Sequence, residues 1–584
     1  MKFFVKIINR IRRLIPEQIA LPLKNTRSED PYESKPWLRF YDQGVPAELE
    51  FPPQNLYELF ANAAEEHRSE TALIYFGKKI TFGRLLQYID RFARALQEEG
   101  VRKGDRVALI LPNIPQFLIA YWATLRIGAV VTPLNPLCSS AELEFLIASC
   151  RPFVIITFAQ LHRRLEGAFE RHKGKVVLTS LSEFMPTGPR FFFWFRAAVS
   201  RTAAKSLPAG LAFRQMLKSP PAPSPVTVSS DDPAVMLFTG GVTGKPKAVL
   251  LLHRNLVANA RQTHAWLGMR SGREVIMGVL PFFHSYGMTA CHHLAMTTGS
   301  ALVLEPRFKA ARVLRLLQKR QPTIFAGVPT MFRALLDELG SRKVKGRLSC
   351  TCVSGGAPLP IELKTAFESA TGCRLIEGYG LTEASPITHC NPVNGEDRPG
   401  SIGLPLPGTE ARIVDVKTRR PVPVGEIGEL QVRGPQVMAG YYENAAETAH
   451  VLGFDGWLCT GDLAKMDESG FFYIVERKKD LILVGGLNVY PSEVESVINR
   501  HPDVEESAVV GIPDDYYGET IRAFVKCRAK KVLDAETILE FCRDKLAAYK
   551  LPRSVVFVDA LPKNFVGKVV RRKLAGEAKN RHKS

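Results

Sequence analysis

Apolar residues recur at helical spacing after Thr81 and are followed by a short, continuous apolar segment. Thr81 is a typical helix N-cap, and the apolar positions that share one face of the helix predicted up to Gly100 are Leu85, Leu86, Ile89, Phe92 and Leu96. Residues 106–113, RVALILPN, then have the pattern of a buried strand. A helix that leads into a fully apolar strand predicts a parallel sheet.

The same alternation returns in the middle of the chain. Val235–Phe238 and Val249–Leu252 are short apolar strands on either side of a glycine-rich segment, and Asn255–Leu267 has a helical pattern. The proline-rich residues 220–225 precede the first of these strands and predict a stiff surface connection between subdomains. The alternation predicts an α/β fold.

The first residues of the chain combine apolar and basic positions. Apolar residues at helical spacing lie opposite basic ones and stop before Pro16: Phe4, Ile7, Ile8, Ile11, Leu14 and Ile15 against Lys6, Arg10 and Arg13. The pattern predicts an amphipathic helix on a membrane surface, or a basic helix docked on its own domain. The aromatic cluster at residues 191–195, followed by cations, fits lipid headgroups or an ordinary core strand.

Charge is concentrated at a few places. The 584 residues carry a net charge of +20, and residues 1–25, 190–218 and 563–584 account for +18 of it. The nearly neutral remainder argues against a nucleic-acid partner, and the apolar residues near the basic ones favour contact with an anionic membrane. Because charges interrupt the N-terminal apolar segment and no long apolar run follows, we expect a cytoplasmic protein, peripheral on the inner face of the membrane.

The ten cysteines show none of the Cys-x-x-Cys spacing of zinc or redox sites, although Cys350 and Cys352 are one residue apart. We therefore expect reduced, mostly buried thiols.

Candidate chemistry begins with the segment FTGGVTGKPKAV, which starts at Phe238. Its glycines, threonines and lysines can surround phosphates with backbone N–H groups and cations. It is not a Walker loop, because the glycine spacing to Lys245 differs and Pro246 stands where a magnesium-binding hydroxyl is needed. A tight hairpin is the alternative interpretation.

Further motifs follow in order, and together they identify a family. They are LPFFHSYGM (280–288), SGGAPL (354–359), GYGLTEASP (378–386), GSIGLPLPG (400–408), WLCTGDL (457–463), ERKKDLILVGGLNVYPSEVE (476–495) and PKNFVGKVVRRKL (562–574). From about residue 55 to 575 the chain resembles the adenylate-forming (acyl-activating) superfamily, and within it most resembles long-chain fatty acyl-CoA synthetases.

The resemblance implies a fold and a division of the chain. The fold is a large N-terminal body of α/β subdomains with a β-rich portion, plus a small, mobile α+β C-terminal domain. We expect a basic N-terminal segment at 1–48, the adenylation domain at 49–476, a hinge at 477–480 and the C-terminal domain at 481–584.

The resemblance also implies which residues hold ATP and Mg²⁺. The phosphate loop corresponds to Thr239, Gly240, Gly241, Thr243, Gly244 and Lys247. Thr382 would contact phosphate, Glu383 would hold Mg²⁺, and Lys568 would reach the reacting carboxylate and α-phosphate. The adenine slot corresponds to Gly355, Gly356, Ala357, Tyr379 and Gly380, while Asp462, supported by Arg477, would take the ribose hydroxyls.

The remaining implied sites serve the acyl group and CoA. His284 and Val328 would border the acyl channel, Lys479 would be the hinge residue, and the CoA tunnel corresponds to Gly485, Gly486 and Leu487. Without this context Thr-Glu is more often a helix start, Asp462 a surface turn, His284 a core histidine and the basic residues solvated charges.

Three places depart from the pattern of the family. Val242 replaces a hydroxyl residue, Ala248 replaces a glycine, and residues 564–566 replace a threonine-rich segment. Loss of one phosphate hydrogen bond at Val242 would cost about 1 kcal/mol, which affects rate more than reaction type.

The predicted activity is ATP- and Mg²⁺-dependent ligation of a long-chain fatty acid to CoA through acyl-AMP. Two alternatives stay open: an acyl-AMP ligase that loads a separate carrier protein, and a non-catalytic membrane- or lipid-binding scaffold. A homodimer is also left open.

Overall fold

The computed structural model describes residues 30–164, 174–188, 211–239, 246–341, 348–514, 516–529, 531, 533–563, 569–571 and 573–575. The predicted N-terminal helix, the aromatic cluster at 191–195, most of the phosphate loop and Lys568 lie outside these residues.

Two large sheets form the centre of the body. The order of the eight-stranded sheet is β19 (Gly440–Tyr441), β9 (Lys247–Leu252), β8 (Pro233–Thr239), β4 (Val130–Pro133), β3 (Arg106–Ile110), β5 (Val154–Phe158), β6 (Lys175–Thr179) and β7 (Leu211–Ala212). The order of the nine-stranded sheet is β16 (Leu404–Pro405), β15 (Ile387–Cys390), β14 (Arg374–Gly380), β13 (Thr351–Ser354), β12 (Ile324–Gly327), β10 (Val275–Gly278), β11 (Ala301–Leu304), β1 (Thr71–Tyr75) and β2 (Lys78–Thr81).

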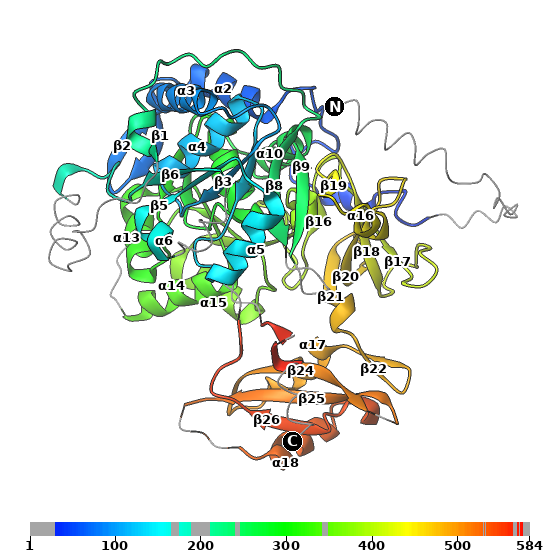
Figure 1. Cartoon of the computed structure of the whole chain (residues 1–584). Coiled ribbons are helices and arrows are strands. Elements are labelled where there is room, and N and C mark those ends of the chain that lie inside the picture. Colours follow the sequence, from blue (N-terminus) through cyan, green and yellow to red (C-terminus); the bar gives the residue numbers. More distant parts are fainter. Residues whose placement is uncertain are drawn as a thin grey trace, which may run out of the picture.

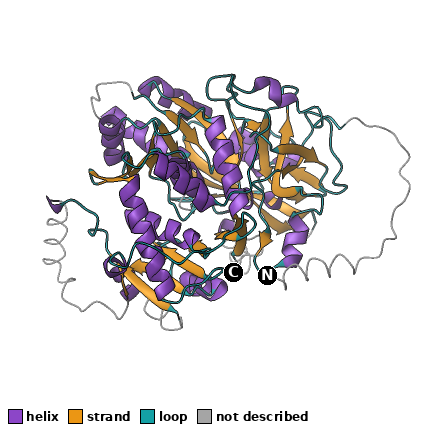
Figure 2. Cartoon of the chain, turned by 90° about the horizontal axis from the view of Figure 1, so that it is seen from above, coloured by secondary structure: helices purple, strands orange, loops and turns teal. Residues whose placement is uncertain are grey.

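Helices pack between and outside these sheets (Figures 1 and 2). They are α2 (Leu56–Glu66), α3 (Phe82–Glu98), α4 (Pro115–Arg126), α5 (Ser140–Cys150), α6 (Ala159–Arg164), α9 (Phe213–Met216), α10 (His253–Trp266), α11 (Ser285–Gly287), α12 (Leu294–Thr297), α13 (Ala310–Arg320), α14 (Pro329–Ser341), α15 (Ile361–Thr371) and α16 (Ala445–Val451). Single turns lie at η1 (Pro36–Phe40) and η3 (Thr382–Ala384), and a π-helical turn, η2, at Met288–His293.

The main apolar core lies between the two sheets. It joins the inner side chains of β3 and β4 to those of β1, β10 and β11 through α3 and α4. Residues 115–125 of α4 are all buried, which is expected of a helix that is apolar on every side. The other face of the nine-stranded sheet packs against α13, α14 and α15, and the other face of the eight-stranded sheet against α5 and α6.

Smaller sheets complete the fold. The β-rich portion is a four-stranded antiparallel sheet of β17 (Glu410–Val414), β18 (Gly428–Arg433), β20 (Leu458–Met466) and β21 (Phe472–Arg477). After the turn η4 (Lys478–Asp480), the C-terminal unit contains β22 (Ile482–Val484), β23 (Leu487–Val489), α17 (Pro491–Ile498), β24 (Val504–Asp514), β25 (Gly518–Cys527), α18 (Ala535–Arg543), η5 (Ala548–Lys550) and β26 (Ser554–Phe557). Figure 1 shows this unit, in orange and red, beneath the body. The predicted fold class is confirmed.

Local predictions are largely confirmed as well. The side chain of Thr81 accepts a hydrogen bond from Arg84 N at the start of α3, and all five apolar positions predicted for its inner face are buried. The strands β3, β4 and β5 are parallel, as expected. The predicted strands around the glycine-rich segment, β8 and β9, pair antiparallel.

The cysteines also match the expectation. None of the ten forms a disulfide, and six are buried. Within the described residues no helix is long and apolar enough to cross a bilayer.

The first testable consequence concerns Glu377 in β14. Burial raises the pKa of this carboxyl group to about 8, and its Oε1 accepts a hydrogen bond from Leu359 N over 3.2 Å. Between its ordinary pKa of about 4.5 and about 8, the folded state therefore binds more protons than the unfolded state, and stability falls as pH rises through this range. Thermal unfolding of Glu377→Gln should lose this contribution to the pH dependence, while Glu362→Gln, at an exposed position on α15, should retain it. Identical profiles for Glu377→Gln and wild type would contradict the assignment.

Candidate active site

A cavity of about 1310 Å³ lies where the body, the four-stranded sheet and the C-terminal unit meet. Its wall contains many of the predicted site residues: Thr239, Lys247, His284, Gly355, Gly356, Tyr379, Gly380, Thr382, Glu383, Arg477 and Lys479. The parallel strands β13 and β14 end here, and the carboxyl ends of parallel strands are the usual place for ligands in such sheets.

The phosphate side of the cavity is built by the β8–β9 hairpin. Antiparallel pairing places Thr239 directly opposite Lys247, so the ends of the glycine-rich segment meet at the cavity wall, while residues 240–245 lie outside the described residues. Lys247 Nζ forms an ion pair with Glu447 and lies 5.0 Å from the centre of the Tyr441 ring. Ala248 belongs to a small apolar cluster with Met236.

The Thr-Glu pair is close to this lysine. Tyr441 donates a hydrogen bond from its hydroxyl to Glu383 Oε1 over 2.9 Å, and Thr382 Oγ1 lies 3.1 Å from Ser285 Oγ. Tyr441 thus contacts both Lys247 and Glu383 and brings the two predicted groups to one side of the cavity.

The predicted adenine slot is narrow enough to require glycine. A Cβ at Gly380 would lie 2.1 Å from the carbonyl oxygen of Pro386, and one at Gly355 would lie 3.1 Å from the Tyr286 ring. Gly356 adopts φ +80°, which favours glycine. Ala357 follows in the sequence and is half-buried, but it is not part of the cavity wall.

Asp462 is held from two sides. Pairing of β20 with β21 puts it opposite Arg477, whose Nε lies 2.6 Å from Asp462 Oδ1. The hydroxyl of Tyr379 donates to the other oxygen, Oδ2, over 2.5 Å. The carboxyl group is 2% exposed, so it is a buried acceptor shared by an arginine and a tyrosine and not the surface turn of the alternative interpretation.

The predicted acyl and CoA residues lie in different places. His284 is in the cavity wall, its Nδ1 accepts a hydrogen bond from Tyr286 N over 3.3 Å, and burial lowers its pKa to about 4. Val328 is buried next to Gly356. Gly485 and Gly486 form the exposed turn between β22 and β23, and Leu487, the exposed first residue of β23, follows. None of the three lines the cavity.

The C-terminal segment reaches the cavity beside the turn η4. Val569, Val570 and Arg571 are part of the wall, as are Lys478, Lys479 and Asp480. Val569 directly follows Lys568 in the sequence, and Lys568 itself lies outside the described part of the chain.

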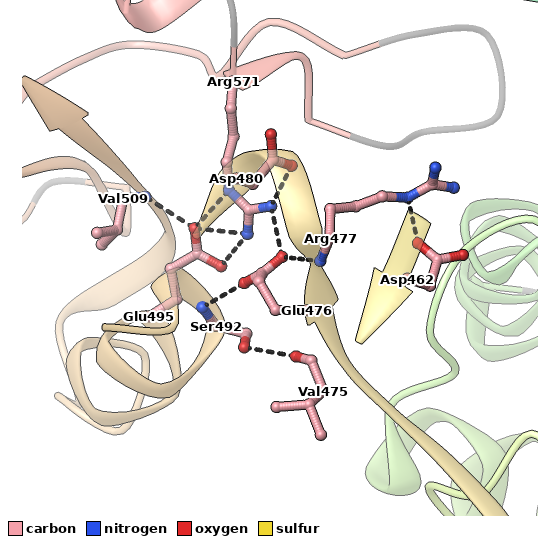
Figure 3. A network of polar contacts seen from close by, with 9 residues as sticks. All are labelled: Asp462, Val475, Glu476, Arg477, Asp480, Ser492, Glu495, Val509 and Arg571. Atoms are coloured by element: carbon pink, nitrogen blue, oxygen red, sulfur yellow. Dashed lines mark hydrogen bonds and ion pairs between the residues drawn. The ribbon is translucent and has the colours of Figure 1, made fainter. Parts of the chain in front are cut away.

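Arg571 anchors this segment to both structural units, as Figure 3 shows. Its guanidinium contacts Glu495 of α17 at 2.8 Å, Glu476 of β21 at 3.2 Å and Asp480 of η4 at 3.2 Å. Glu476 also accepts a hydrogen bond from Ser492 N over 2.8 Å. One half-buried cation thus connects the four-stranded sheet, the turn η4 and the C-terminal unit.

Sequence analysis missed several residues that complete the site. Tyr441 and Glu447 belong to no recognised motif, and Ser285 lies within LPFFHSYGM but was given no role. Tyr441 reaches the cavity because β19 pairs with β9. Arg571 stands inside the predicted basic tail, but its spacing from Glu476 and Glu495 gives no signal of the contact.

Comparisons with known proteins agree with this geometry. A family model described as AMP-binding enzyme matches residues 60–442, and one described as AMP-binding enzyme C-terminal domain matches residues 493–568. A long-chain-fatty-acid–CoA ligase of Bacillus subtilis is 38% identical over 554 residues, which are 94% of this chain and 99% of that protein.

Solved structures share the fold over most of the chain. ATP-bound MatB from Rhodopseudomonas palustris has a TM-score of 0.79 at 29% identity and covers 90% of this chain and 99% of its own. The o-succinylbenzoate CoA synthetase of Bacillus subtilis, in complex with its acyl-adenylate intermediate, has a TM-score of 0.74 at 27% identity and covers 89% and 98%. The chain belongs to the AMP-binding enzyme family.

The second prediction concerns the ion-pair network of Arg571. Arg571→Met should leave the buried carboxylate of Glu476 and the half-buried carboxylate of Glu495 without their cation. Loss of one partner of a fully buried ion pair typically costs about 3 to 5 kcal/mol, and this partly exposed network should lose less. We expect faster limited proteolysis between residues 477 and 481 and reduced turnover, with a smaller effect for Arg571→Lys. Arg553→Met removes an exposed ion pair with Asp514 in the same unit and should change little. If Arg571→Met is cleaved at the same rate as the wild-type protein, Arg571 does not link the body to the C-terminal unit.

Proposed function

We propose that this protein is an AMP-forming ligase that activates a long-chain fatty acid with ATP and transfers the acyl group to CoA. The observation that carries the proposal is the single cavity in which Lys247, Glu383, Tyr379 and Arg477 converge. The relative named as a long-chain-fatty-acid–CoA ligase, similar over nearly its whole length, supports the choice of substrates.

In the first step the carboxylate would attack the α-phosphate of ATP, giving acyl-AMP and pyrophosphate. Negative charge accumulates around the phosphates, so stabilisation by cations and N–H groups is the main requirement. Lys247 and the segment 239–244 would supply it. Because Lys247 is paired with Glu447 before ATP binds, the phosphates would have to compete with this carboxylate.

Glu383 fits the proposed magnesium site. Its half-buried carboxylate accepts from Tyr441 on Oε1, which leaves Oε2 for an ion, and Mg²⁺ is commonly held by one or two carboxylates together with nucleotide phosphates. When bound, Mg²⁺ would neutralise phosphate charge. Thr382, which neighbours Ser285 Oγ, would donate to the same phosphate group.

The nucleoside would occupy the slot beside β14. Asp462 would accept from the ribose hydroxyls while Arg477 stays on Oδ1, and the Tyr379 hydroxyl would give up its place on Oδ2. The freed ring could then stack on adenine, with Gly355, Gly356, Ala357 and Gly380 leaving room for the base.

The acyl group would lie along the apolar part of the cavity, where the wall includes Ile324, Ala326 and Val353. Val328 packs next to Gly356 behind this wall. With a pKa of about 4, His284 would be neutral at neutral pH and would not hold the fatty carboxylate as a cation.

We propose the division of the chain expected from the sequence, with 477–480 as the hinge. In the arrangement seen here Val569 and Val570 line the cavity, whereas Gly485, Gly486 and Leu487 are exposed to solvent, which favours the adenylation stage. Rotation about Lys479 would exchange these segments so that the CoA thiol reaches acyl-AMP and displaces AMP.

The third prediction tests the reaction and Lys568 together. Purified full-length protein, incubated with ATP, Mg²⁺, CoA and a panel of fatty acids from short to long, should form long-chain acyl-CoA and AMP, as read by mass spectrometry. Lys568→Ala should lower the rate of acyl-AMP formation about a hundredfold or more.

Lys563→Ala is the matched control for this test. Lys563 lies five residues before Lys568 in the sequence and forms an ion pair with Glu506 at the surface. Acyl-AMP without thioester would favour loading of a carrier protein, and no ATP-dependent product would favour the scaffold. Full activity of Lys568→Ala would refute the role of this lysine.

We also propose peripheral contact with anionic membranes through residues 1–25, on the basis of their sequence pattern. Deletion of these residues should reduce cosedimentation with vesicles that contain anionic lipid, and high salt should weaken binding of the intact chain. The same deletion should leave turnover of a soluble medium-chain acid unchanged. Equal cosedimentation of the two chains would exclude this contact.

A further inference from the structure

Three cysteines meet at the amino-terminal ends of two neighbouring strands of the nine-stranded sheet, and the cavity lies at the carboxyl ends of the same strands. Cys350 precedes β13, Cys352 lies within it, and Cys373 precedes β14. The two strands are parallel with Thr351 opposite Arg374, so Cys350 comes to lie beside Cys373. The Sγ atoms of Cys350 and Cys352 are 3.5 Å apart, those of Cys350 and Cys373 are 3.3 Å apart, and all three lie within 4.8 Å of one another.

These separations suit ligands of one metal ion. Zinc–thiolate bonds of about 2.3 Å in tetrahedral geometry place the sulfur atoms about 3.8 Å apart. The separations from Cys350 to Cys352 and to Cys373, 3.5 and 3.3 Å, are shorter than this value by only a few tenths of an ångström, so small side-chain movements would suffice. The three sulfur atoms are unbonded, since no cysteine of the chain forms a disulfide.

The cluster is enclosed but has access to solvent. Cys352 is 0% exposed and Cys373 is 3% exposed, while Cys350 is half-buried. Cys373 also lines a surface depression of about 420 Å³, together with Lys364 and Arg374. An ion can therefore reach the thiols from one side, and the protein surrounds them on the others.

The charges around the cluster fit a bound ion. Three thiolates and one divalent cation leave a net charge of −1, which a nearby cation can balance. Arg374 donates to the carbonyl groups of Pro392 and Gly395 and, among the described residues, pairs with no carboxylate. Lys364 is already paired with Glu368 and Asp397, so Arg374 is the available counter-charge.

We propose that Cys350, Cys352 and Cys373 form a binding site for a soft divalent metal ion such as Zn²⁺. Each thiol releases one proton to solvent as its sulfur binds the ion, water completes the coordination, and no oxidation or reduction occurs. The ion joins the starts of β13 and β14, the strands whose other ends carry Gly355 and Tyr379. Its role is structural, and it stands apart from the ligase reaction.

The site can be tested with Cd²⁺, which gives an ultraviolet charge-transfer absorption with thiolates. Full-length protein, purified in reductant and freed of metal, should saturate this absorption at one equivalent of Cd²⁺. Each single change, Cys350→Ser, Cys352→Ser or Cys373→Ser, should lower the absorption by about a third, and the triple change should abolish it. Cys527→Ser, at a half-buried cysteine of the C-terminal unit, should leave it unchanged.

A second measurement needs no variant. Zn²⁺ should slow alkylation of Cys350, mapped by mass spectrometry, and raise the midpoint of thermal unfolding of the wild-type protein. Because thiols must lose their protons to bind the ion, protons should compete with the metal and affinity should fall as pH is lowered. The proposal is overturned by Cd²⁺ absorption that survives the triple change, by unaltered alkylation of Cys350, or by a Cys350–Cys373 disulfide in protein that takes up no metal.

Discussion

A partly buried guanidinium between the body and the C-terminal unit governs how the parts of this protein meet. Arg571 is surrounded by Glu476, Asp480 and Glu495, which come from the β-rich sheet, the connecting turn and the C-terminal unit. A charge partly withdrawn from water is stabilised by partners close by, so Arg571 favours the arrangement in which these segments stay together. The composite wall of the cavity belongs to this arrangement, because its residues Val569 and Val570 directly precede Arg571.

The same network bears on how the two proposed stages of the reaction would use a single cavity. The proposed domain rotation would separate Arg571 from at least one of its carboxylate partners, and the separated cation and anions would then be solvated. The free energy lost when the ion pairs break is partly offset by hydration of the separated charges. The two arrangements would then be close in free energy, and binding of substrates would determine which one is populated. A larger apolar interface would fix one arrangement permanently.

Local sequence patterns predicted much of the fold. Most of the features that they did not predict are contacts between residues far apart in the sequence. The cap at Thr81 and the apolar face of α3 depend on residues within one helix, so periodicity was sufficient. The contact of Lys247 with Glu447 joins residues 200 positions apart through strand pairing, and no sequence spacing encodes it. The cysteine cluster is similar, because Cys373 reaches Cys350 through the register of β13 and β14. The resemblance of the motifs predicted that Asp462 and Arg477 belong to one site. It did not predict the hydrogen bond that the Tyr379 hydroxyl donates to the carboxylate of Asp462.

The hydrogen bond between Tyr379 and Asp462 bears on which sugars the site would accept. In the proposed complex the nucleotide must displace the tyrosine hydroxyl before its own hydroxyls can reach Oδ2. A ribose offers two donors in exchange for the one that is lost, so the exchange is favourable. A deoxyribose offers one and only breaks even, with the carboxylate still paired to Arg477. The tyrosine would thereby make the proposed site discriminate against deoxynucleotides without any group that clashes with them.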